Sequence, residues 1–178
     1  MSLSNLQKKL IQLEDDLDKT HQKIKELFEE KQHIPTNDHV YCYFNHSLIL
    51  EHEKNKSRLI MGNFHIKNMS DQVKNLPIIL IKITSQGDFR FTGKFQTENQ
   101  RNTKGFQWER IMLKNLDPKN HFCLKPINTE QLDPNELLSF QNFQIKIPLD
   151  AAIIVEGFVY FDESNDGVPA INAINIGV

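Results

Sequence analysis

A repeat of apolar residues, at alternating spacings of three and four, runs through the first 34 residues of the chain. This spacing is typical of a coiled-coil seam, in which positions a and d of each heptad are apolar. No Gly or Pro interrupts the run before Pro35, where we expect the helix to end. The seam positions expected to hold copies together are Leu3, Leu6, Leu10, Leu13, Leu17, Ile24 and Leu27. The repeat predicts a coiled-coil helix that makes the chain a homo-oligomer through residues 3–34.

In the alternative arrangement, this helix folds back and packs on the rest of the chain. The 32 residues would span about 48 Å at 1.5 Å per residue. A globular body made of the remaining residues would be about 37 Å across. The helix is therefore expected to extend beyond that body, although packing on a sheet of the same chain stays open. Leucine at both seam positions leaves the number and orientation of the helices undefined.

The hydrophobic pattern changes to a period of two after residue 37. Phe89, Phe91, Gly93 and Phe95 alternate with polar residues, as in a strand with one buried face. Many short strands joined by polar turns favour two packed antiparallel sheets. We therefore predict a mainly β protein with an N-terminal α-helix. Residues 1–36 would form the coiled-coil helix and a linker, and residues 37–178 an antiparallel β-sandwich of immunoglobulin-like or jelly-roll type.

Further strands follow from apolar runs in the second half of the chain. The runs 78–83 and 151–161 are apolar on both faces, as expected of central strands. Residues 162–167 have turn chemistry and are expected to connect the second run to a strand at 168–178. A stretch at 116–137 with three prolines is expected to form a long loop.

Charge and composition exclude several classes of protein. The formal net charge of −2 lacks the basic field expected of a nucleic-acid binder. Two cysteines, Cys42 and Cys123, are too few for a disulfide scaffold, and we expect Cys42 in the core. No apolar run is long enough to span a membrane. The N-terminus lacks the apolar region of a secretory signal, which predicts a cytoplasmic location, with incorporation into a larger particle or coat left open.

The sequence contains no local catalytic, phosphate-binding or zinc-binding motif. We therefore predict no catalytic residues, no metal site and no cofactor. The weak candidates for ligand binding are Trp108, Arg101 and Lys104, in and after a polar loop at 96–106. A lone Trp in a β protein is more often a core residue. The resulting hypothesis is a non-enzymatic assembly or interaction protein that presents a β-sandwich to protein partners. The alternative is a module that binds carbohydrate or peptide.

Overall fold

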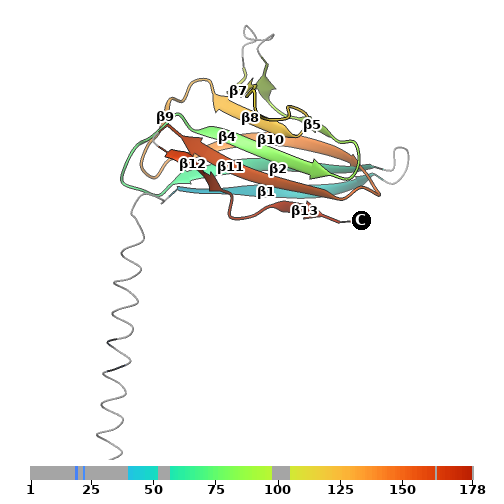
Figure 1. The fold of residues 1–178 in the computed structure, drawn as a ribbon, viewed down its shortest axis with the longest axis horizontal. Helices are drawn as coiled ribbons and strands as arrows, with labels where there is room; N and C mark the ends of the chain where they lie inside the picture. Colours follow the sequence, from blue (N-terminus) through green and yellow to red (C-terminus); the bar gives the residue numbers. More distant parts are fainter. Residues whose placement is uncertain are drawn as a thin grey trace, which may run out of the picture. The chain divides into compact units, whose positions relative to one another are not determined.

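The structure is a computed structural model, and it describes residues 19, 22, 40–51, 57–97, 105–162 and 164–177. The chain divides into two units, Met1–Asn37 and Asp38–Val178. The second unit is built from strands (Figure 1). They are β1 (Val40–Glu51), β2 (Ser57–Asn68), β3 (Lys74–Asn75), β4 (Ile78–Ser85), β5 (Arg90–Thr92), β6 (Phe95–Gln96), β7 (Trp108–Ile111), β8 (His121–Pro126), β9 (Gln131–Leu132), β10 (Leu137–Pro148), β11 (Ile153–Phe161), β12 (Ser164–Pro169) and β13 (Ile174–Ile176).

The predicted N-terminal α-helix and its coiled coil are wrong for the part of the chain that the structure describes. Lys19 and Gln22 are isolated, exposed positions with helical backbone, and no helix is among the elements of the described residues. A heptad pattern states which residues would share a face, but it does not supply the packing from which most helical stability comes. The seam residues Leu3, Leu6, Leu10, Leu13, Leu17, Ile24 and Leu27 lie outside the described residues.

Two large sheets account for most of the strands. The four-stranded sheet has the order β1-β2-β10-β5. The seven-stranded sheet has the order β12-β11-β4-β8-β7-β6, with β13 also pairing with β11. The pairs are antiparallel apart from β6 and β7, which run parallel. The two sheets are stacked face to face, with β11 facing β1 (Figure 1).

The core lies between these sheets because alternate side chains of each strand point inward. In β2 the buried positions fall at every second residue from Arg58 to Asn68. Phe44 and Phe64 meet at ring centroids 4.8 Å apart, above Gly157 of the opposite sheet. A Cβ at Gly157 would lie 2.3 Å from Phe64 Cε2 and 2.8 Å from Phe44 Cζ. A residue without a side chain is therefore required here for the sheets to approach this closely.

The predicted strand over Phe89–Phe95 is divided between the two sheets. Arg90–Thr92 pairs with β10 in the four-stranded sheet, and Phe95–Gln96 pairs with β7 in the seven-stranded sheet. The chain crosses between them at Gly93, where a Cβ would lie 2.6 Å from Phe140 Cζ. The alternation of aromatic residues persists across this crossing because both segments face the same core.

Two predicted loops are shorter than expected. Phe161 pairs with Ser164, so the turn at 162–167 is tight and most of it belongs to β12. The expected loop at 116–137 contains β8 and β9. Its apolar residues Phe122, Leu124 and Leu132 are buried and are covered by the opposite sheet and its connections.

A segment after β12 closes one side of the stacked sheets. The backbone N–H of Ala170 donates to Gly157 O (2.8 Å) in one sheet, and that of Ile171 to Cys42 O (2.9 Å) in the other. The side-chain amide of Asn172 then bonds to the Phe44 backbone as a neighbouring strand would. Its Oδ1 accepts from Phe44 N (2.7 Å), and its Nδ2 donates to Phe44 O (2.9 Å). The prediction of a buried Cys42 is confirmed, and burial raises the pKa of its thiol to about 12.

Candidate functional site

A row of apolar residues crosses the outer face of the seven-stranded sheet. Cross-strand pairing places Pro169 beside Phe158, Phe158 beside Leu80, Leu80 beside Cys123, and Cys123 beside Ile111. Five neighbouring strands therefore contribute one apolar residue each to a row on the face away from the core. We call this set the apolar row. An outer sheet face is ordinarily polar, so an apolar row on it indicates a contact surface.

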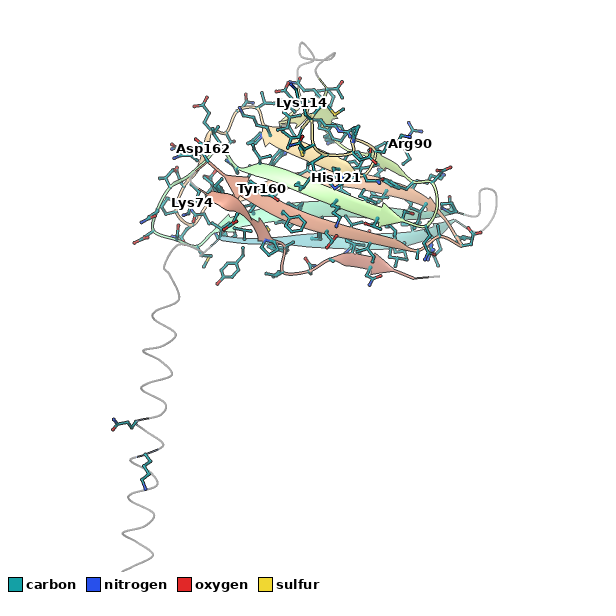
Figure 2. The ribbon with its side chains drawn as sticks, in the orientation of Figure 1. Lys74, Arg90, Lys114, His121, Tyr160 and Asp162 are labelled. Atoms are coloured by element: carbon teal, nitrogen blue, oxygen red, sulfur yellow. The ribbon has the colours of Figure 1, made fainter. Side chains whose placement is uncertain are left out.

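A polar row borders the apolar row on one side. Glu156 pairs with Lys82 across β11 and β4, and Lys82 pairs with His121 of β8. Lys82 Nζ and Glu156 Oε2 form an ion pair of 2.8 Å. On the other side Tyr160 pairs with Ile78. Figure 2 shows Tyr160 and His121 on this face of the sheet, which is turned toward the viewer. Side chains that can form hydrogen bonds therefore lie on both sides of the apolar row.

The apolar row ends in a hollow of about 260 Å³ at the edge formed by β7 and β8. Its lining is apolar apart from one imidazole, and consists of Ile111, Met112, Leu113, Leu116, Pro118, His121 and Cys123. Met112 is 62% exposed and Leu113 is 49% exposed. The volume lies just below the roughly 300–1,000 Å³ typical of small-molecule pockets, so it suits one or two side chains of a partner better than a large ligand.

The loop that forms this hollow is held by its own hydrogen bonds. Leu116 N donates to Leu113 O (3.2 Å), and His121 N donates to Asp117 O (2.9 Å). Asp117 Oδ1 also accepts from Lys119 N at 3.0 Å. Arg110 donates to the backbone oxygen of Pro118 and so ties the loop to β7. The hollow is therefore formed before any partner binds, which lowers the entropy lost on binding.

The thiol at the base of the hollow is held in its neutral form. Burial raises the pKa of Cys123, and the positive charge of Arg110 opposes this shift. The Arg110 guanidinium lies 4.3 Å above the ring of Phe122, and burial lowers its pKa. A neutral thiol is a weak nucleophile and behaves as a small apolar group. Cys123 therefore contributes apolar surface to the hollow.

The ligand-binding residues predicted from the sequence are only partly described. Trp108 is 2% exposed and packs edge-on against Phe140, at a centroid distance of 5.8 Å. It borders a smaller polar hollow of about 190 Å³ with Lys94, Gly105, Gln107, Gln141 and Asn142. Arg101 and Lys104 lie outside the described residues. The indole is a core side chain that touches this hollow, and its face is not open for stacking on a ligand.

The outer face of the four-stranded sheet carries a second, more polar group. Tyr43, His65 and Ser139 lie side by side on β1, β2 and β10. The rings of Tyr43 and His65 are 4.9 Å apart, and His65 Nδ1 is 2.7 Å from Ser139 Oγ. Tyr41, two residues before Tyr43 on the same face, is exposed. Burial lowers the pKa of His65 and so favours its neutral ring.

Neither metal ligands nor membrane-spanning helices are found in the described part of the chain. No group of three or more His, Cys, Asp or Glu residues there is placed to hold a metal ion. The same residues include no helix with the length and hydropathy needed to cross a bilayer.

Comparisons with known proteins identify no relative. No family model and no curated protein matches the chain. Two solved structures of a GH20 exo-β-N-acetylglucosaminidase from Vibrio harveyi, one with N-acetylglucosamine and one of an inactive mutant, match at 10% identity, with TM-scores of 0.32 and 0.30. Each covers 79% of this chain, which spans 18% of that enzyme. A likeness this low does not bear on what this chain binds or does.

Proposed function

We propose that the chain is a non-enzymatic interaction protein and that its β unit binds a protein partner through the apolar row. The observation that carries the proposal is that five neighbouring strands place apolar residues in one row on an outer sheet face. Met112 and Leu113 extend it as exposed side chains. Burying such side chains in a contact contributes about 25 cal/mol per Å² of apolar area.

The partner surface is expected to present one or two large apolar side chains. The hollow beside Leu113 has room for them, and its lining is apolar. The ion pair of Lys82 and Glu156 at the rim supplies one charge of each sign, so it favours neither an acidic nor a basic partner. Specificity would then come from the shape of the hollow and from hydrogen bonds at its rim.

A display library of random peptides, panned against the full chain, tests this proposal. We expect enriched peptides to share a large apolar residue and to lose at least 10-fold in affinity on Leu113→Lys. Lys114→Ala, at an exposed neighbour of Leu113, is the matched control and should leave affinity unchanged. Enriched peptides that bind Leu113→Lys as well as the wild type would contradict the proposal.

The alternative is a carbohydrate-binding module, and the aromatic group on the four-stranded sheet favours it. Tyr41 and the tilted pair of Tyr43 and His65 form an aromatic surface on which a sugar ring can stack. A glycan array with wild type and Tyr41→Ala separates the two functions. Glycan binding that is lost in this variant would favour the alternative. Self-association through residues 3–34, a cytoplasmic location and incorporation into a larger particle stay predictions.

A further inference from the structure

The second half of β1 is an open sheet edge. β1 lies at the end of the four-stranded sheet, and among the described residues it pairs with β2. The backbone N–H of Phe44 donates to Asn172, and the backbone oxygen of Cys42 accepts from Ile171. These bonds show that the backbone N–H and C=O groups of the even-numbered residues of β1 point away from β2. The alternation of an antiparallel ladder places His46, Leu48 and Leu50 in the same set. Their outward N–H and C=O groups have no strand partner among the described residues.

The side chains along this edge are exposed, and three of the six are apolar. All six residues from Asn45 to Leu50 are exposed, and Leu48, Ile49 and Leu50 are 42%, 44% and 49% exposed. Natural sheet edges are ordinarily protected by Lys, Pro, a bulge or a covering segment. The segment Asn45–Leu50 has no charged residue and no Pro. Its register with β2 is unbroken over 12 residue pairs, so no bulge twists it away.

We propose that this edge pairs with the same edge of a second copy of the chain, in an antiparallel arrangement with its two-fold axis at Leu48. Leu48 then lies opposite Leu48, Ile49 opposite Ser47, and Leu50 opposite His46. Three outward-facing pairs exchange two backbone hydrogen bonds each, which joins the two four-stranded sheets into one. This surface is separate from the apolar row, so the inference does not depend on the proposed function.

The absence of charged residues from Asn45–Leu50 allows this edge to pair with an identical copy. Two identical edges bring like charges together wherever a charged residue lies near the axis, and such contacts are destabilising. Asn45–Leu50 avoids this cost by having no charged residue. In this register Leu48 also lies opposite Leu48, and Ile49 lies opposite the small residue Ser47. Asn172 limits the paired length, since its amide already occupies the edge at Phe44.

Substitution of Leu48, which lies on the proposed two-fold axis, by residues of opposite charge tests the pairing in the full chain. Leu48→Lys and Leu48→Glu each place like charges face to face, so each variant alone should have a lower mass by light scattering than the wild type. An equimolar mixture places Lys opposite Glu and should restore the wild-type mass. Thr84→Lys, at an exposed position of β4, is the matched control and should keep the wild-type mass.

Three outcomes would overturn the inference. They are a wild-type chain that is monomeric at 100 µM, Leu48 variants that keep the wild-type mass, and a mixture that does not regain the wild-type mass. The last outcome would mean that Leu48 of one copy does not lie opposite Leu48 of the other. The far-UV circular dichroism of the Leu48 variants should match that of the wild type, because the Leu48 side chain is exposed in the single copy.

Discussion

The side-chain amide of Asn172 occupies the edge of β1 as a strand would, by accepting from Phe44 N at 2.7 Å and donating to Phe44 O at 2.9 Å. Asn172→Ala removes both bonds and is expected to cost about 1–2 kcal/mol of the free energy of unfolding. Urea denaturation measures this loss. Asn175→Ala, at an exposed residue of β13, is the control and should cost less than about 0.5 kcal/mol. Equal losses in the two variants would show that the amide contributes nothing specific.

Arg58 fixes the end of the chain to the inner face of β2. Its Nη1 donates to Gly177 O at 2.6 Å, and its Nη2 donates to Ala151 O at 2.5 Å. Arg58→Ala leaves these carbonyls without their charged donor, so we expect a loss of about 3 kcal/mol. Arg58→Lys should lose less, because an ammonium group can replace one of the two bonds.

Hydrogen exchange separates this effect from general destabilisation. In Arg58→Ala, the amides of Ile174–Ile176 should lose protection before those of β2. Arg90→Ala, at an exposed arginine of β5, should change neither measurement. Uniform loss of protection along the whole sheet would contradict a local role for Arg58.

Gly157 sets the distance between the sheets. Gly157→Ala would place a methyl group against Phe64 and Phe44, at 2.3 Å and 2.8 Å before any shift. We expect a loss of about 1–3 kcal/mol from overpacking. Adding Phe44→Leu should recover part of it, and double-mutant analysis of urea midpoints measures the coupling. Gly177→Ala meets no atom within 4 Å and should be neutral.

The stability of the β unit should depend on pH through His65. Burial lowers the pKa of His65 below its usual 6.5. The unfolded chain therefore binds a proton at a higher pH than the folded chain, and the free energy of unfolding rises with pH in that interval. Stability should fall as the pH is lowered through 6.5 toward the pKa of the folded state. His65→Gln should flatten this part of the profile, and an unchanged slope would contradict the assignment.

The period-two pattern predicted the strands well but could not assign them to sheets. Phe91 and Phe95 keep the same parity, yet they belong to different sheets, because the crossing at Gly93 preserves the inward direction of both. A one-dimensional pattern records which side chains face the core. It does not record which backbone they pair with.

Part of the apolar row lies in two sequence runs whose pattern does not distinguish a covered sheet face from an exposed one. The runs 78–83 and 151–161 are apolar on both faces, and this pattern predicts central strands. β4 and β11 are indeed flanked by strands on both edges, but the outer-face residues Leu80 and Phe158 are only half-buried. Leu113 could not be assigned in this way, since it lies in a non-periodic loop whose position depends on tertiary hydrogen bonds.

The contacts that close the stacked sheets also set an order of events during synthesis. Asn172 is 128 residues beyond Phe44, and Gly177 is 119 residues beyond Arg58. At about 5–20 residues per second, translation takes about 6–26 s to cover the longer interval. β1 and β2 are therefore synthesised several seconds before Asn172, and any hairpin that they form in that interval leaves the whole β1 edge accessible to chaperones and neighbouring nascent chains.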